Sequence, residues 1–256
     1  GQRSLAVAAS DLAAMGATPL AFTLALTLPT VHTDWLQAFA RGLNQMAVAC
    51  NLRLIGGGTT RGPLCLTLTV FGRVPSGRAL TRSGAQAGDV LCVGGELGNA
   101  AGALPLVLGQ RSAESFIAQP LLAHYWSPQP QLALGQALRG KATSALDISD
   151  GLLADCGHIA LASQVRLLID RDRVPVSLAL EEFLGSAGAQ QAALSGGDDY
   201  VLAFTLPERD VPTLQADGWP IHVIGRVVEG QGVGLLDADG QDITPAIRGY
   251  QHFRGI

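Results

Sequence analysis

The sequence predicts a mixed α/β and α+β protein of two domains, a smaller one over residues 1–80 and a larger one over residues 81–256. Strand-like and helix-like patterns alternate in both halves of the chain, which is typical of sheets covered by helices. The halves meet at a polar stretch rich in glycine, serine and arginine, residues 75–85, of the kind that separates domains. With 256 residues, 48% of them hydrophobic, the chain is long enough for two domains of ordinary size.

Hydrophobic periodicity predicts the elements of the first half in order. Leu5 and Leu12 share one face of a helix, and Gly16 follows as a stop signal. An apolar run with the length of a buried strand comes next, then a second amphipathic helix, and Leu66 and Leu68 alternate with threonines in a final strand. The expected elements are helices over residues 4–15 and 34–50 and strands over residues 18–28, 53–55 and 64–74.

The second half contains short apolar runs bounded by glycine or polar residues, which is typical of buried strands. Alanine- and leucine-rich segments between these runs have the composition of helices. The expected strands cover residues 89–93, 144–148, 165–169, 200–205, 222–228 and 233–236. The expected helices are one that follows Gly98 and runs to residue 108, two over residues 113–124 and 131–138, and one that begins near Gly151.

The composition excludes several classes of protein. A net charge of −4, from 17 basic and 21 acidic residues with Lys141 as the only lysine, argues against binding to nucleic acid. No apolar run reaches the ~20 residues that span a bilayer, so we expect no membrane segment. The four cysteines are far apart and form no C-x-x-C pair, which disfavours a zinc site and indicates a reducing, cytoplasmic location.

Two acidic clusters are the strongest candidates for chemistry. Residues 147–155 carry three aspartates where a strand gives way to a helix, and such carboxylates either cap the helix or bind a cation. Three of them exceed what capping needs, so we favour metal or phosphate binding there. Residues 195–200 place Asp198 and Asp199 after two glycines, and here a turn and a functional role stay equal alternatives.

Glycine clusters at residues 56–62 and 94–98 are candidates for anion binding, because unshielded backbone N–H groups can surround a phosphate. Neither fits the Walker pattern, and most such clusters are simply turns. Asp11, in the middle of the first helix, is by itself an ordinary solvated carboxylate, and Arg82 could reach a phosphate from the domain junction. Taken together, these residues indicate Mg²⁺-dependent binding of a nucleotide phosphate.

In their order along the chain, these motifs resemble the thiamine-monophosphate kinase family, of the superfamily that includes aminoimidazole ribonucleotide synthetase and selenophosphate synthetase. The most specific matches are Ser-Asp-Leu-Ala-Ala-Met-Gly-Ala at residues 10–17 and Gly-Gly-Gly-Thr-Thr-Arg-Gly at residues 56–62. The resemblance covers nearly the whole chain, with further matches at residues 24–29, 82–85, 147–152, 195–200 and 249–253.

The resemblance implies ATP-dependent phosphorylation of thiamine monophosphate to thiamine diphosphate by direct phosphoryl transfer, the last step of thiamine diphosphate biosynthesis. It also implies several Mg²⁺ ions, ATP as co-substrate and no general base. On the family pattern the metal ligands would be Asp11, Asp147 and Asp150. ATP would contact Gly57, Gly58, Arg82 and Ser149, and the thiamine substrate would contact Asp198 and Tyr250.

The resemblance implies a fold as well. An N-terminal α/β sheet domain would pair with that of a second subunit to form a homodimer, and a C-terminal α+β domain of the aminoimidazole ribonucleotide synthetase type would close over a cleft. Members of the family carry a further acidic segment upstream of the first match. We therefore expect this chain to be an N-terminally truncated form whose sheet lacks its first strands.

Four positions depart from the family pattern. Gly58 stands where the family has a metal-binding aspartate, so one Mg²⁺ site should be weaker. Asp198 replaces a glutamate and reaches one methylene less far. Gln131 replaces an arginine and Gln251 an aspartate, and we expect both changes to be tolerated.

Two other functions stay open at this point. One is another enzyme of the superfamily with a different substrate, although residues 249–253 favour the thiamine substrate. The other is a non-catalytic protein that retains affinity for nucleotides, for which Gly58 and the expected truncation are the only support.

Overall fold

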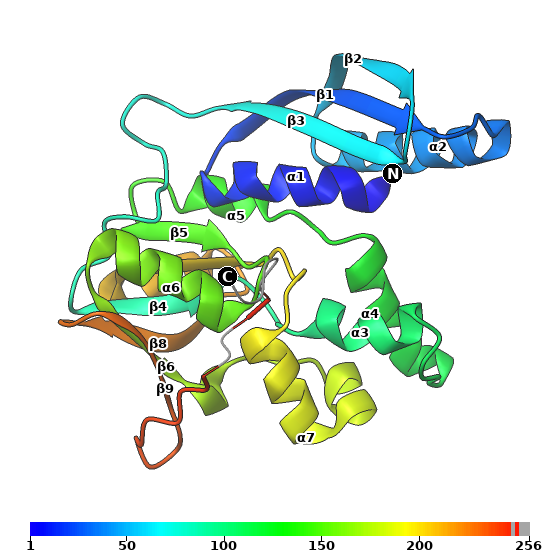
Figure 1. Ribbon diagram of the computed structural model, residues 1–256. Helices are drawn as coiled ribbons and strands as arrows, with labels where there is room; N and C mark the ends of the chain where they lie inside the picture. The colour runs from blue at the N-terminus through cyan, green and yellow to red at the C-terminus, as the bar shows by residue number, and fades with distance from the viewer. Residues whose placement is uncertain (247–248, 251–256) are drawn as a thin grey trace.

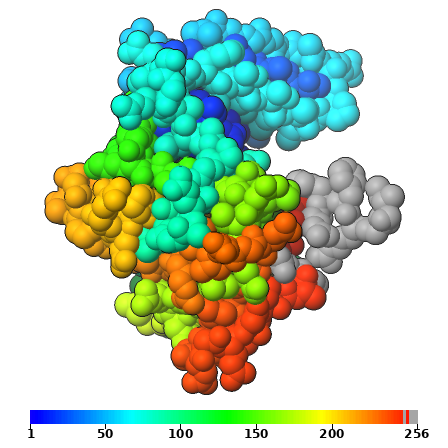
Figure 2. Space-filling view, turned by 90° about the vertical axis from the view of Figure 1, so that its left-hand side faces the viewer, coloured from blue at the N-terminus to red at the C-terminus, as the bar shows by residue number. Residues whose placement is uncertain are grey.

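The computed structural model describes residues 1–246, 249 and 250, which form two sheets with helices packed on them (Figure 1). A three-stranded sheet lies within residues 18–73 and a six-stranded sheet within residues 89–236. The blue and cyan N-terminal residues form an upper lobe that sits on the larger C-terminal part (Figure 2). The mixed α/β and α+β architecture predicted from the sequence is confirmed.

Five elements make up the N-terminal sheet and its helical cover: α1 (Gln2–Ala14), β1 (Thr18–Leu28), α2 (Thr33–Ala49), β2 (Arg53–Arg61) and β3 (Cys65–Arg73). β1 is the central strand, with β2 parallel to it and β3 antiparallel. Both helices cover the same face of the sheet (Figure 1). The buried Leu12 of α1, Phe22 of β1 and Leu43 of α2 belong to one hydrophobic core, which fixes α1 against the strands.

Strand β2 differs from the prediction. The sequence predicts a strand that ends at residue 55 and a loop after it, but the backbone stays extended as far as Arg61 and pairs with β1 throughout. Gly57 has a φ of +144°, and a Cβ there would lie 1.9 Å from the carbonyl oxygen of Leu24, so this position requires glycine. All nine residues of β2 are exposed, which leaves an open sheet edge.

The C-terminal sheet has six strands: β4 (Asp89–Val93), β5 (Ser144–Asp147), β6 (Arg166–Asp170), β7 (Leu202–Pro207), β8 (His222–Val228) and β9 (Gly232–Leu236). They lie in the order β5-β7-β4-β8-β6-β9. Three helices pack on this sheet: α5 (Leu132–Ala137), α6 (Leu152–Ser163) and α8 (Val211–Ala216). Successive strand residues face opposite cores, so Leu91 packs with Leu153 of α6, whereas Cys92 packs with Leu134 of α5 and Leu214 of α8.

A smaller helical cluster flanks this sheet: α3 (Asn99–Val107), α4 (Ser115–Trp126) and α7 (Leu178–Ser195). Its core contains the buried Ala103, Leu121 and Leu180. Neither α7 nor α8 is predicted from the sequence. The side chain of Ser177 caps α7 by accepting a hydrogen bond from the Leu180 N–H, and Gly185 kinks the helix with a φ of +72°.

Helix α5 joins the two parts of the chain. It packs so closely on α1 that a Cβ at Gly135 would lie 2.1 Å from the carbonyl oxygen of Ala13. Arg139, just after α5, donates hydrogen bonds to the carbonyl oxygen of Gly16 and, over 2.9 Å, to the hydroxyl of Thr18. Helix α1 is therefore held between its own sheet and the C-terminal part. Within the described residues, no helix has the length and apolar character to cross a membrane.

Candidate active site

Asp147 ends β5, and the segment that follows it carries Ser149 and Asp150. The shape of this segment depends on one buried carboxylate. Asp155, in the first turn of α6, is 4% exposed. Its Oδ2 accepts hydrogen bonds from the N–H groups of Ser149, Asp150 and Gly151 at 2.9, 2.9 and 3.1 Å. Asp155 therefore holds the loop in shape, which is the capping role that the sequence left open beside cation binding for this cluster. Asp147 and Asp150 are left for other roles.

The loop over residues 195–200 lies directly beside this segment. The N–H of Asp198 donates to the carbonyl oxygen of Ser149 over 2.9 Å, and the N–H of Tyr200 donates to that of Ile148 over 2.8 Å. Gly197 permits the approach, because a Cβ there would lie 2.2 Å from the Ser149 carbonyl oxygen. The two acidic clusters singled out in the sequence thus form one surface.

The adjacent aspartates of this loop have different roles. Asp199 is buried, and its carboxylate accepts hydrogen bonds from the N–H groups of Gly98 and Ala100 at the start of α3, over 2.7 and 3.4 Å. Burial raises the pKa of Asp199 to about 7, although those N–H groups oppose the shift. Asp198 instead forms an ion pair with Arg3 at 2.8 Å and accepts a hydrogen bond from the Tyr200 hydroxyl. Only Asp198 is available to a ligand.

In the glycine cluster at residues 94–98, a candidate anion site, the N–H groups of Gly94 and Gly98 are bound to partners within the protein. The N–H of Gly94 donates to the carbonyl oxygen of Leu202, and the N–H of Gly98 to Asp199. Gln131 completes this connection, because its side chain donates to the Gly94 carbonyl oxygen and accepts from the Leu202 N–H, each over 2.8 Å. Gln131 thus ties β4 to β7, a role that its amide fills with one donor and one acceptor.

Asp11 lies on α1 and faces the same surface from the N-terminal side. Partial burial raises the pKa of Asp11, the negative charge of Asp147 raises it further, and the positive charge of Arg82 lowers it. The three charges are therefore close enough to affect one another, although they come from α1, from the end of β5 and from the domain junction. Next to them a cavity of about 640 Å³ is lined by Arg3, Asp11 and Tyr200 with apolar residues of α1 and β3.

Tyr250 returns to this surface from the end of the chain. Its N–H donates to the carbonyl oxygen of Asp150 over 3.0 Å. The preceding Gly249 passes so close to α6 that a Cβ would lie 2.5 Å from the Asp150 carbonyl oxygen and 2.6 Å from the Cβ of Ala154. Gln251 and the rest of the closing motif lie outside the described residues.

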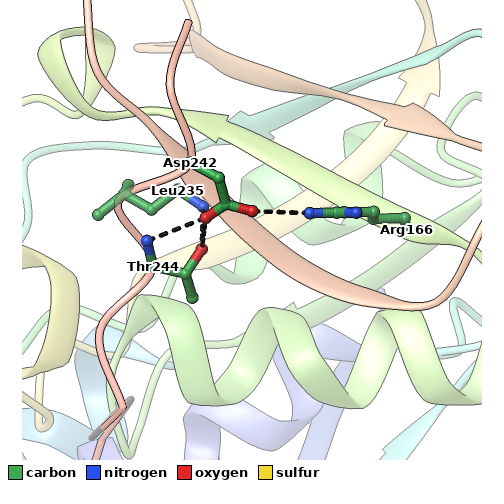
Figure 3. A network of polar contacts seen from close by, with 4 residues as sticks. All are labelled: Arg166, Leu235, Asp242 and Thr244. Carbon is green, nitrogen blue, oxygen red and sulfur yellow. Dashed lines mark hydrogen bonds and ion pairs between the residues drawn. The ribbon is translucent and has the colours of Figure 1, made fainter.

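A polar network holds Asp242 and Thr244, which follow β9, against the sheet (Figure 3). Arg166 of β6 donates to Asp242 Oδ2 over 2.8 Å, and Asp242 Oδ1 accepts from the Thr244 N–H over 3.0 Å. The hydroxyl of Thr244 in turn accepts from the Leu235 N–H of β9 over 2.8 Å. Asp242 and Thr244 are therefore anchored to the edge of the sheet.

Gly57 and Gly58 lie elsewhere in the single chain. The cavity is lined from β3 by Leu66 and Leu68, whereas β2 forms the opposite edge of the sheet. The structure thus brings together Asp11, Asp147, Arg82, Ser149, Asp150, Asp198 and Tyr250 but not the two glycines. It also adds Arg3, which stands in no distinctive motif, and Tyr200, which closes the motif at residues 195–200 but is given no role there by the sequence.

Family models and a curated relative match this chain over most of its length. The family model described as AIR synthase related protein, N-terminal domain, matches residues 1–74, and the corresponding C-terminal domain model matches residues 86–237. Thiamine-monophosphate kinase of Escherichia coli K12 is 43% identical over 98% of this chain and 79% of its own length.

Solved structures give the same result. The crystal structure of thiamine-monophosphate kinase from Stenotrophomonas maltophilia K279a is 44% identical, with a TM-score of 0.87 over 94% of this chain and 78% of its own. AaThiL complexed with AMPPCP and TMP is 28% identical, with a TM-score of 0.88 over 98% of this chain and 79% of its own. By sequence and by fold, the chain belongs to the thiamine-monophosphate kinase family of AIR synthase-related proteins.

Proposed function

We propose that this protein transfers a phosphoryl group from ATP to thiamine monophosphate, giving thiamine diphosphate and ADP. The proposal rests on one observation above others. A member of the thiamine-monophosphate kinase family brings Asp11, Asp147 and Arg82 from three parts of the fold to one surface beside a cavity. A relative of the same fold has been solved with AMPPCP and TMP, which supports a site for a nucleotide and a thiamine phosphate in this chain.

The chemistry needs positioning more than proton transfer. A phosphate oxygen of thiamine monophosphate attacks the γ-phosphorus of ATP, and the bond from that phosphorus to the β-bridging oxygen breaks as ADP leaves. Because the attacking oxygen is already ionised at neutral pH, no general base is required. The difficulty is to bring two polyanions together, which cationic groups accomplish by electrostatic stabilisation.

Mg²⁺ would supply most of that positive charge, and we assign Asp11, Asp147 and Asp150 to it. The carboxylates fit the ion, because Asp11 and Asp147 repel each other and a divalent cation would relieve the repulsion. Among the described residues, no group of three His, Cys, Asp or Glu side chains is placed to hold a metal by itself. Mg²⁺ commonly takes one or two carboxylates and completes its shell with phosphate oxygens and water, so this donor set suits an ion that arrives with ATP.

The remaining assignments follow the chemistry of each side chain. Arg82 and Ser149 would donate hydrogen bonds to ATP phosphates, and Gly57 and Gly58 would contact ATP through their backbone. Asp198 would face the cationic ring of the thiamine substrate, and the half-exposed ring of Tyr250 would stack on it.

The assembly and location implied by the family are part of the same proposal. A homodimer would cover the exposed β2 edge and allow Gly57 and Gly58 to meet a nucleotide. A domain boundary near residue 80 accords with the separate sheets and with the two family-model matches. A cytoplasmic location accords with four cysteines that are all unpaired.

The direct test is thiamine diphosphate formation from ATP, Mg²⁺ and thiamine monophosphate, with thiamine as the control acceptor. We expect product from the monophosphate and none from thiamine. Asp150→Asn should abolish transfer and leave the circular-dichroism spectrum unchanged, whereas Asp217→Asn, an exposed aspartate far along the chain, should retain full activity. A folded protein that binds ATP but forms no product would favour the non-catalytic alternative.

A further inference from the structure

Arg3, in the first turn of α1, joins three separate parts of the molecule. Its Nη2 lies 2.8 Å from Asp198 Oδ1, and its Nη1 donates a hydrogen bond to the carbonyl oxygen of Tyr125 at the end of α4. The guanidinium carbon also lies 4.1 Å from the centre of the Tyr125 ring, so the cation stacks on the aromatic face. A planar guanidinium can make all three contacts at once, which the compact ammonium group of lysine cannot do.

The contacts of Asp198 are concentrated on one of its two oxygens. Arg3 and the Tyr200 hydroxyl both bind Oδ1, at 2.8 Å each. Within the described part of the chain, the Asp198 side chain makes no other hydrogen bond or ion pair. Oδ2 is therefore left for a ligand, on a side chain that is 42% exposed, and Arg3 itself is only 23% exposed. The carboxylate is thus held at one oxygen and open at the other.

The backbone at Asp198 is constrained as well as its side chain. Asp198 and Tyr200 have φ values of +71° and +54°, a left-handed conformation that residues other than glycine rarely adopt. Such a conformation persists where surrounding contacts hold it, and it is common at ligand sites. Here the holding contacts are the backbone hydrogen bonds to Ile148 and Ser149 and the side-chain contacts to Arg3.

We propose that Arg3 is a positioning residue for the thiamine end of the site, which fixes Asp198 so that Oδ2 faces the cationic ring of the substrate. Arg3 lines the cavity beside Asp11 and Tyr200, so its loss would alter the site at the substrate end. The inference rests on the proposed function. It adds that recognition of the substrate depends on a contact between α1 of the N-terminal part and the loop over residues 195–200 of the C-terminal part.

The test compares steady-state kinetics of Arg3→Met with those of the wild type in the full chain. Methionine fills similar space but removes the charge and the hydrogen-bond donors. We expect the KM for thiamine monophosphate to rise about 10–100-fold, with kcat and the KM for ATP within about 3-fold of the wild type. The KM of Arg3→Lys for thiamine monophosphate should lie between those of the wild type and Arg3→Met. The matched control is Arg173→Met, which removes an arginine paired with Asp170 at 3.7 Å outside the site.

A double-mutant cycle separates positioning from general stabilisation. If Arg3 acts through Asp198, the Arg3→Met change should alter the KM for thiamine monophosphate by less than about 2-fold in an Asp198→Asn background. If the effects of the two changes on this KM multiply in the double variant, the inference is overturned. It is also overturned if Arg3→Met alone raises the KM values for thiamine monophosphate and ATP equally, or lowers only kcat. Asp198→Asn keeps the size of the side chain, so the comparison is possible even where Asp198→Ala is unstable.

Direct binding keeps the inference testable if turnover is absent. Titration calorimetry with thiamine monophosphate, with inorganic phosphate as a second titrant, should show weaker binding of the thiamine ligand to Arg3→Met and no change for phosphate. A wild-type chain that turns over its substrate together with an unaffected Arg3→Met variant refutes the role of Arg3 and leaves the proposed function standing. A wild-type chain that neither binds nor phosphorylates thiamine monophosphate refutes both.

Discussion

Replacing Asp155 by alanine should lower both stability and activity, although Asp155 touches no substrate in the proposed mechanism. Its Oδ2 accepts three backbone hydrogen bonds from residues 149–151, and the side chain is 4% exposed. Burial raises the pKa of Asp155 while the three N–H groups lower it, so the carboxylate is desolvated and largely compensated by the loop. Alanine removes the acceptor and leaves the donors in place.

The size of the effect follows from the surroundings of the donors. An unsatisfied buried donor costs about 1–3 kcal/mol. The Gly151 N–H is buried and bears the full cost, whereas those of Ser149 and Asp150 are part-buried and can find water. We therefore expect Asp155→Ala to lower the free energy of unfolding by about 2–4 kcal/mol. Asp155→Asn retains one acceptor oxygen and should cost about 1 kcal/mol.

Urea denaturation at neutral pH measures the stability of both variants, with Asp217→Asn as a surface control. Thiamine diphosphate formation, measured well below the denaturation midpoint, should fall about 10–100-fold in Asp155→Ala, because the loop that carries Ser149 and Asp150 loses its support. A variant with stability within 0.5 kcal/mol of the wild type, on the order of a neutral surface change, would refute the reasoning. So would full activity in a destabilised Asp155→Ala.

Three other outcomes test separate features. Because the pKa of Asp199 is raised to about 7 in the folded state, its contribution to stability is complete below its ordinary pKa of 3.8 and is lost as the pH rises towards 7. Urea denaturation from about pH 4.5 to pH 8 should therefore show a stability advantage over Asp199→Asn that shrinks with pH. A Cβ at Gly58 would meet no atom within 4 Å, so Gly58→Asp should fold. It should reduce the Mg²⁺ concentration for half-maximal activity, whereas the uncharged Gly58→Asn should not. Of the four cysteines only Cys65 is exposed, so Ellman's reagent should titrate one thiol in the native chain and four in urea.

The sequence predicts most of the fold because most elements have clear local patterns. β1, β4 and β8 begin and end where the sequence predicts them, since each is rich in apolar residues and flanked by turn residues. Helix α7 escapes prediction because Gly185 and Gly188 interrupt its pattern, and the tertiary core around Leu180 supplies the stability that its local sequence lacks. β2 escapes for the opposite reason, because glycines that favour a turn are held extended by pairing with β1.

The candidate site is less predictable than the fold. The sequence identifies clusters of aspartates, but it cannot tell that Asp155 and Asp199 are buried acceptors for backbone N–H groups while Asp198 is open. That distinction depends on residues far apart in sequence, such as Gly98 beside Asp199. Arg3 has no local signal at all, since its partners Tyr125 and Asp198 meet it only in the folded chain.

The backbone hydrogen bond between Tyr250 and Asp150 has a consequence for the order in which the protein is made and degraded. Every strand of both sheets has been synthesised by Leu236, whereas the residue that reaches Asp150 emerges from the ribosome later. A nascent chain can therefore complete both sheets and their hydrophobic cores before Tyr250 reaches Asp150. Conversely, a protease that cuts between residues 237 and 249 would leave both sheets folded but separate Tyr250 from the rest of the chain. Loss of activity would then precede unfolding.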